Sequence, residues 1–570
     1  MLKRIIAFAA VALMTCSLLA GCTSKAPAQE SAAPAENTAA ADATAEAPAD
    51  INETGVLKLR WHQRCGIDTL FECPMDDCQS LYPYMVFDPL VSMSGKDGNI
   101  VPKLATEYTV TDDGLTYTFT LRDDVLWQDG TPFTAADVAF TFWANVADPN
   151  AGVCKSMMTN IVGAGDVANS AATSLFGVVV NGNKVSVTLT TPNRSFLNFV
   201  AMMYILPAEQ FTSVDPANLG TCDFWAKPFG TGAYVIDQVS FPDYFTCVRN
   251  DAYWGEKAGI KNVLFTNYTT GGDDAVVAAL IAGDLDFAYG NTLNDITVAS
   301  NVNAQNSDVE SVVMPSNYCR YFVFNEVGAT DGQENPGMKD VKVRQAISML
   351  VDREAIASLY AGQAEVRTTF VPNAHPMYND DIAPFQRDVE GAKQLLTDAG
   401  FDFTKKIRIC YYYDDQTTVD AMDLVCQNLA DAGIQAEAFL ATGDLGSILY
   451  TVHNYDMLYC GWSKDDPVNI YIEVMADGGE EPIQDGYDYR KANFTDKLNA
   501  YNAATDDATA KQIADEIQAA GVESCYFFPV YGLSNIEMVN KAHVSIPEVV
   551  QEYGYQYNRD YKFAEWSLVG

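Results

Sequence analysis

The sequence predicts an α/β protein of two lobes, with a cleft between them and a β-rich subdomain on the first lobe. The chain has 570 residues, of which 48% are hydrophobic, and this is enough to form a separate core in each lobe. Its first half contains hairpins with alternating apolar residues, whereas its second half alternates short apolar strands with helices of 3.6-residue period.

The N-terminus has the pattern of a secretory signal peptide. Lys3 and Arg4 precede an apolar run over residues 5–19, which is too short to span a bilayer comfortably. The run ends in Leu-Ala-Gly-Cys, which resembles a bacterial lipobox. We therefore expect residues 1–21 to be removed and Cys22 to carry a lipid that anchors the protein outside the cell membrane. A cleaved signal that leaves Cys22 free is the alternative.

Residues 22–54 are rich in Ala, Pro and acidic residues and contain hardly any large apolar side chain. Such a segment cannot form a core, so we expect a disordered acidic tether between the anchor and the folded lobes.

The first predicted strand covers residues 56–61, where apolar and polar residues alternate. Two hairpins follow, over residues 106–121 and 178–189. Asp-Gly at the turn of the first and Asn-Gly at the turn of the second supply the positive φ angles that tight hairpins require.

Helices are predicted from their capping residues. Thr134, three residues before Asp137, opens a helix that continues through Trp143. Later, Asp340 caps a second helix, and Gly400 ends a third.

A β-α-β unit is predicted in the second half, because a helix over residues 419–429 is flanked by apolar strands at residues 407–413 and 435–440.

Charge and motifs exclude several classes of function. The formal net charge is −40 at pH 7, which disfavours binding to nucleic acid. No HExxH, GxSxG or P-loop motif occurs, so an enzyme such as a secreted hydrolase is disfavoured. The four histidines lie far apart in the sequence: His62, His375, His453 and His543.

The 13 cysteines are scattered without a CxxC pair, and we expect most of them to be buried, reduced thiols. His62 lies near Cys65, Cys73 and Cys78, but their spacing is not that of a standard metal site. We therefore expect neither a metal nor a cofactor.

Several strings together resemble the peptide- and nickel-binding solute-receptor family of ABC importers. The matching strings, which occur in the family's order, are VPKLA (101–105), WQDGTPFTAADV (127–138), FGTGAY (229–234), NDAYWG (250–255), VRQAIS (343–348) and FPVY (528–531). The resemblance covers roughly residues 55–565 and implies the two-lobed fold of type II periplasmic binding proteins, the "Venus flytrap".

The resemblance also implies the lobe boundaries. The first lobe would comprise residues 55–312, with the β-rich subdomain at about 80–205. The second lobe would comprise residues 313–528, and residues 529–570 would return to the first lobe.

A ligand site is implied by the string GWSKDDP at residues 461–467, which is similar to the cleft segment of peptide-binding members. The resemblance places Asp465 against the α-amino group of a ligand and Trp462 against its apolar part. The alternative is that Asp465 and Asp466 only cap the helix after Pro467.

Arg320 is the candidate for binding a ligand carboxylate through its planar guanidinium, although it could equally be a surface or interlobe residue. Asn317 and Tyr318 are weaker candidates beside it, and Lys464 adds a positive charge next to Asp465.

The resemblance implies a monomeric, lipid-anchored substrate-binding protein that captures short peptides by cleft closure and delivers them to an ABC permease and ATPase. One alternative is that the same fold binds a nickel chelate, a haem or an oligosaccharide. Another is that the protein is a signalling lipoprotein that senses peptides. The three-cysteine segment at residues 64–78 departs from the family's simpler loop and leaves the ligand class open.

Overall fold

The computed structural model describes residues 50–61, 71, 73–74, 81–94, 99–150, 158–268, 272–288, 296–332, 336–464, 466–479, 481–547 and 560–570. The expected signal peptide, Cys22 and most of the expected tether lie outside these residues. Within the described ranges, no helix combines the length and apolar character needed to cross a membrane.

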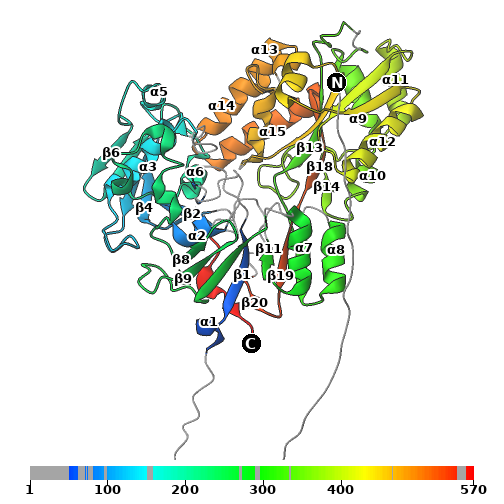
Figure 1. Ribbon diagram of the computed structural model, residues 1–570. Helices are drawn as coiled ribbons and strands as arrows, with labels where there is room; N and C mark the ends of the chain where they lie inside the picture. The colour runs from blue at the N-terminus through cyan, green and yellow to red at the C-terminus, as the bar shows by residue number, and fades with distance from the viewer. Residues whose placement is uncertain are drawn as a thin grey trace, which may run out of the picture. The chain divides into compact units, whose positions relative to one another are not determined.

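Strands of the first lobe form a seven-stranded mixed sheet (Figure 1). Its order is β12 (Val309–Met314), β19 (Asn535–Asn540), β11 (Phe287–Ala288), β1 (Val56–Trp61), β10 (Asn262–Asn267), β9 (Tyr244–Arg249) and β8 (Tyr234–Ser240). β1 runs parallel to β10 and β11, and the other pairs are antiparallel. Helices α7 (Gly272–Ala282) and α8 (Ile296–Gln305) pack on one face, and Ile536 and Met538 of β19 share their apolar core.

The expected hairpins and the capped helix are confirmed in the β-rich subdomain. Its four-stranded sheet has the order β4 (Ala105–Val110), β5 (Thr116–Leu121), β7 (Lys184–Thr188) and β6 (Val178–Asn181). Gly114 and Gly182 occupy the two turns with φ of 68° and 63°, a region where glycine is favoured. Helix α3 (Ala135–Ala147) begins with a capping box between Thr134 and Asp137. The described part of the subdomain also contains the short helices α5 (Ala164–Ala168) and α6 (Phe196–Met202).

The second lobe contains a six-stranded sheet with helices on both faces (Figure 1). The strand order is β14 (Ala364–Val366), β18 (Phe527–Leu533), β13 (Cys319–Phe324), β17 (Met457–Trp462), β15 (Lys406–Tyr411) and β16 (Gln435–Leu440). One face is covered by α9 (Val341–Leu350), α10 (Arg353–Ser358), α11 (Val389–Asp398) and α12 (Gln416–Asp431). The other face is covered by the 3-10 helix η5 (Pro467–Val474), α14 (Asp496–Ala503) and α15 (Asp507–Ser524).

The β-α-β unit of the second lobe is confirmed, because β15 and β16 are parallel and α12 connects them. Helix α12 begins at an Asp415 cap, and the chain turns after it at Gly433 with φ of 84°. Asp340 likewise caps α9, and Gly400 follows α11 with φ of 69°.

The chain crosses twice between the two main sheets, once through residues 315–318 and once at Ser534. The second sheet therefore extends to Leu533, beyond the boundary expected at residue 528. β18 has buried side chains on both faces of its sheet and pairs with β13 as far as Gly532, so its sequence alone does not show where the sheet ends.

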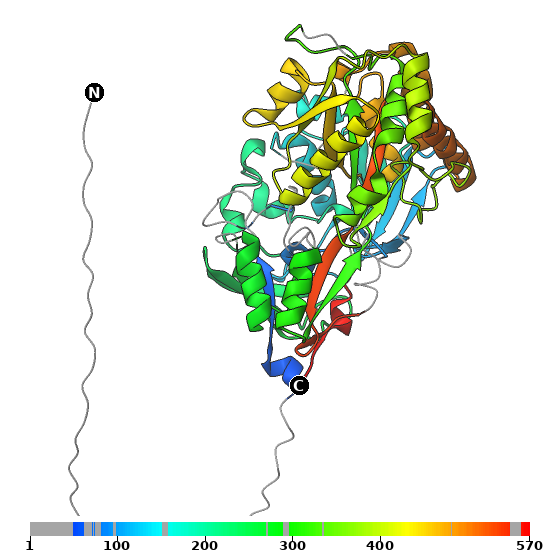
Figure 2. The same cartoon turned by 90° about the vertical axis from the view of Figure 1, so that its right-hand side faces the viewer.

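The last residues of the expected tether are folded. Asp50 caps the short helix α1 (Ile51–Thr54), and Glu53 forms an ion pair of 2.6 Å with Arg249. The described chain begins and ends at the same end of the first lobe, where the Leu568 N–H donates to the Asn52 side chain at 2.7 Å (Figures 1 and 2).

Candidate functional site

Four of the five predicted ligand-binding residues lie together where the chain enters the second sheet. Asn317 and Tyr318 belong to the crossing segment, and Arg320 is the second residue of β13. Trp462 ends the neighbouring strand β17 and stands opposite Cys319 in the antiparallel register. Asp465 lies outside the described residues, so its role stays a prediction.

Arg320 is the most unusual side chain of this group, because it is buried and has no carboxylate partner among the described residues. It is 8% exposed, and its Nε and Nη1 atoms are buried without a hydrogen-bond partner. Across the described parts of the chain no carboxylate forms an ion pair with it. The centre of the guanidinium lies 3.2 Å from the ring centroid of Tyr413 and 5.2 Å from that of Tyr318. A stacked guanidinium of this kind keeps its edge available for an anion.

A chain of phenols runs beside Arg320. The Tyr413 hydroxyl donates to the Tyr412 oxygen at 3.2 Å, and the Tyr318 and Tyr413 hydroxyls are 3.1 Å apart. Because Tyr413 uses its single hydrogen on Tyr412, Tyr318 must be the donor to Tyr413. Burial raises the pKa of all three phenols, so each stays neutral at pH 7.

A second group of phenols lies deeper. The Tyr459 ring centroid is 5.7 Å from the Arg320 guanidinium, and the Tyr459 and Tyr531 hydroxyls are 2.6 Å apart. Tyr531 donates in turn to Tyr360 at 2.6 Å. Neutral rings and hydroxyls therefore surround the cation on the sides that the structure describes.

Gly461 makes room for this arrangement. It stands opposite Arg320 in the β13–β17 register, and a Cβ atom on it would lie 2.2 Å from the Tyr318 hydroxyl oxygen and 3.0 Å from Cδ of Arg320. Only glycine allows the Tyr318 ring to approach β17 this closely.

Trp462 offers an accessible aromatic face, since 42% of it is exposed. The Lys464 ammonium lies 4.8 Å from the centroid of its ring, and the Asn317 side chain donates to the Lys464 carbonyl at 3.2 Å. The added positive charge thus contacts Trp462. Asp466 has the capping role considered above, because its side chain accepts from the Val468 N–H at 3.0 Å at the start of η5.

Of the tyrosines around Arg320, Tyr318 was predicted from the sequence, whereas Tyr412, Tyr413, Tyr459 and Tyr531 were not. Tyr412 and Tyr413 follow the carboxyl end of β15, which is parallel to both of its neighbours. Ligand sites in α/β sheets commonly lie beyond the carboxyl ends of parallel strands, so the Tyr-Tyr-Tyr run at residues 411–413 was a usable signal.

The β-rich subdomain contacts the second lobe at Arg194. The Arg194 guanidinium forms a 2.7 Å ion pair with Asp507 and lies 5.6 Å from the ring centroid of Tyr501. The backbone N–H of Arg194 donates to the Asn502 carbonyl at 2.9 Å. The Asn469 side chain also donates to the Ser195 hydroxyl at 3.4 Å. These contacts hold the two lobes against each other in this conformation.

Metal-binding geometry is absent from the described residues, where no three His, Cys, Asp or Glu side chains could together hold an ion. Cys73 is buried. His62, Cys65 and Cys78 lie outside the described residues.

Comparison with protein families gives a match over most of the chain. Residues 99–482 match the family model of bacterial extracellular solute-binding proteins, family 5.

Relatives and a solved structure agree with this match. A Brucella ovis protein assigned as an ABC transporter peptide-binding protein is 30% identical over 403 residues, which cover 68% of this chain and 70% of the relative. The nickel-binding periplasmic protein of Escherichia coli is 30% identical over 330 residues, 56% of each chain. The crystal structure of the ABC transporter substrate-binding protein CtaP from Listeria monocytogenes superimposes with a TM-score of 0.73 at 20% identity and covers 90% of this chain and all of that one.

Proposed function

The chain belongs to the bacterial extracellular solute-binding proteins of family 5, and we propose that it captures short peptides and delivers them to an ABC importer. The name of the Brucella ovis relative supports the peptide as ligand and the importer as partner. The observation that carries the proposal is Arg320, a buried cation that no carboxylate of the described chain pairs with, at the point where the chain crosses between the lobes.

Arg320 would bind the C-terminal carboxylate of the peptide. A buried charge without a partner is unfavourable, and a carboxylate offers two oxygens to the guanidinium edge in the geometry that arginine prefers. Every peptide with a free C-terminus has this group, so the contact would be independent of sequence. The neutral phenols of Tyr318 and Tyr413 would hold the guanidinium in place without neutralising it.

The rest of the peptide would contact Trp462 and Asp465. The exposed indole of Trp462 offers a flat apolar surface for a side chain. Asp465, by the family resemblance, would accept hydrogen bonds from the α-ammonium group. Asn317 would support this wall indirectly, because it binds the carbonyl of Lys464 next to Asp465.

Closure of the two lobes would couple binding to delivery. The ligand shifts the equilibrium from the open to the closed conformation only if it makes more contacts in the closed one. The chain crosses between the sheets at residues 315–318 and at Ser534, and such short connections can act as hinges. A monomer anchored through lipid on Cys22, with residues 22–49 as its tether, would present the closed form to the permease.

A survey of ligands by thermal unfolding tests the proposed function. The chain without residues 1–21 would be heated alone and with alanine peptides of two to six residues, nickel, haem or maltotriose. Ligand at a hundred times its dissociation constant adds about 2.7 kcal/mol, so peptides should raise the melting temperature by several degrees. The shift should disappear in Arg320→Met and persist in Arg387→Met, which removes a partly exposed arginine paired with Asp431.

A nickel complex is the second candidate, because the Escherichia coli nickel-binding relative has the same identity of 30%. A stabilising shift with nickel and an added carboxylate chelator, together with no shift from any peptide, would replace the proposed ligand and retain the family.

A further inference from the structure

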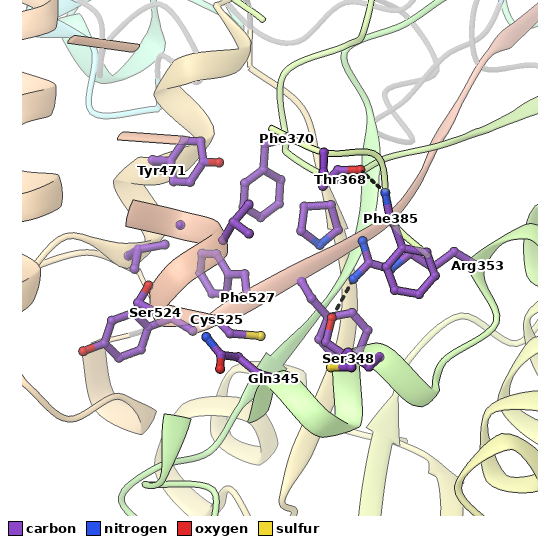
Figure 3. Close-up of a pocket in the computed structure, with 18 of the residues that line it drawn as sticks. Gln345, Ser348, Arg353, Thr368, Phe370, Phe385, Tyr471, Ser524, Cys525 and Phe527 are labelled. Carbon is purple, nitrogen blue, oxygen red and sulfur yellow. Dashed lines mark hydrogen bonds between the residues drawn. The ribbon is translucent and has the colours of Figure 1, made fainter. Parts of the chain in front are cut away.

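A cavity of about 290 Å³ lies inside the second lobe, away from the crossing segments (Figure 3). Its walls come from α9, α10, α11, α15, η5, η7 (Lys491–Thr495) and β18 and from the segment between β14 and α11. Seven of the lining residues are aromatic: Phe370, Phe385, Tyr471, Phe494, Tyr526, Phe527 and Phe528.

Arg353 is the only Lys, Arg, Asp or Glu among the lining residues, and it is buried, with 3% of its surface exposed. It donates to the Ser348 hydroxyl at 2.6 Å (Figure 3). It also donates to the Arg367 carbonyl at 2.9 Å. Its Nε atom is buried with no hydrogen-bond partner. Within the described ranges no carboxylate forms an ion pair with it, and one side of the guanidinium is covered by Phe385 at 3.8 Å.

The charge of Arg353 is poorly compensated by these neutral groups. Burial lowers the pKa of Arg353 to about 9, yet the side chain remains mostly protonated at neutral pH. Desolvating a cation without a counter-ion is unfavourable, and the contact with the Phe385 face offsets only part of this cost. An anion that entered the cavity would supply the missing partner.

We propose that this cavity binds a small monocarboxylate with an aromatic or short aliphatic body, held by Arg353 through its carboxylate. The body would lie among the rings of Phe370, Phe494 and Phe527, where burial of apolar surface adds affinity. This would be a second ligand site within the second lobe, separate from Arg320.

The cavity has an accessible rim. Ala383 and Val522 line it and are both exposed, so a ligand can enter beside them without a change in the core. Because Ala383 lies on the surface, a larger side chain there would obstruct the entrance with little effect on folding.

Calorimetric titration of the chain without residues 1–21 with 3-phenylpropanoate and with its neutral amide tests the proposal. The carboxylate should bind at least about tenfold more tightly than the amide, which keeps the same body and lacks the charge. Ala383→Phe should weaken binding of both by about tenfold or more. Arg353→Gln, if it folds, should make the two probes equal.

A control separates this site from the peptide site. Arg320→Met should leave 3-phenylpropanoate binding unchanged, whereas it should abolish the stabilisation by peptides. The proposal fails if the wild-type chain binds neither probe at millimolar concentration or binds acid and amide equally. It also fails if binding is lost in Arg320→Met and retained in Ala383→Phe.

Discussion

Buried arginines in this chain fall into two groups. Arg344 and Arg408 are paired with carboxylates, Glu326 at 3.2 Å and Asp456 at 3.2 Å. Arg320 and Arg353 are equally buried, and among the residues that the structure places, neither has a carboxylate partner. Arg490 is also buried and has no ion pair among the described residues, but its Nε and Nη1 donate to the Asp485 and Met475 carbonyls. Arg320 and Arg353 each keep a buried Nε without a hydrogen-bond partner, which supports a ligand role for these two.

The sequence singled out Arg320 and Trp462, because they lie in recognisable strings. It could not reveal that Arg320 lacks a carboxylate, since any of the 75 acidic residues could have folded against it. It gave no ligand role to Arg353, because a cavity results from the packing of segments that are far apart in the chain.

Glu537 gives a prediction for pH dependence. Its Oε2 atom is buried without a partner, and burial raises the pKa of Glu537 from 4.5 to about 8. The folded state then holds a proton that the unfolded state releases above about pH 4.5, so this group stabilises the fold at low pH. That contribution is lost as the pH rises through about 8.

Glu537→Gln should therefore stabilise the protein relative to wild type by about 2 kcal/mol or more at pH 8.5 and by much less at about pH 5. Guanidinium unfolding at the two pH values measures this difference. Glu310→Gln is the control, because Glu310 lies on the adjacent strand β12, is exposed and pairs with Lys541. If Glu537→Gln changed the unfolding free energy equally at both pH values, the Glu537 carboxyl of the folded wild type would be ionised at both.

At the scale of elements, predictions succeeded where the signal was local. The hairpins at Gly114 and Gly182 and the capping box of α3 each depend on a few adjacent residues. The end of β18 depends instead on its pairing with β13, and helix α1 depends on the contact between Glu53 and Arg249. Neither contact is visible in the sequence around those elements.

Strand β17 carries the next prediction. Gly461→Ala would place a methyl group within 3 Å of Tyr318 and against Arg320, which should displace both from their positions. We expect peptide affinity to fall by about tenfold or more, with a smaller loss of unfolding free energy. Isothermal titration and guanidinium unfolding measure the two effects.

Gly165→Ala is the matched control, because no atom lies within 4 Å of a Cβ at that position in α5. If Gly461→Ala binds peptide as tightly as Gly165→Ala does, Tyr318 and Arg320 do not form the ligand wall.

At the scale of the whole molecule, Arg194 connects the β-rich subdomain to the second lobe through Asp507, Tyr501 and Asn502. If these contacts belong to the closed conformation, Arg194→Ala should favour the open form. Because one ion pair of this exposure is worth about 1 kcal/mol or less, peptide affinity should fall by about fivefold or less.

Small-angle scattering with and without peptide would show the change in opening, and titration would give the affinity. Lys393→Ala removes an exposed ion pair with Glu390 on α11 and should alter neither the opening of the lobes nor the peptide affinity. An unchanged affinity in Arg194→Ala would mean that the contact is the same in both conformations.

The central claim is that Arg320 receives the carboxylate of a captured peptide. The most direct measurement is calorimetric titration of the wild-type chain with trialanine and with trialanine amide. The account predicts that the amide binds at least about tenfold more weakly, and that Arg320→Met binds both equally and weakly. Equal affinity of the wild-type chain for the acid and the amide, or no binding of either, would contradict it.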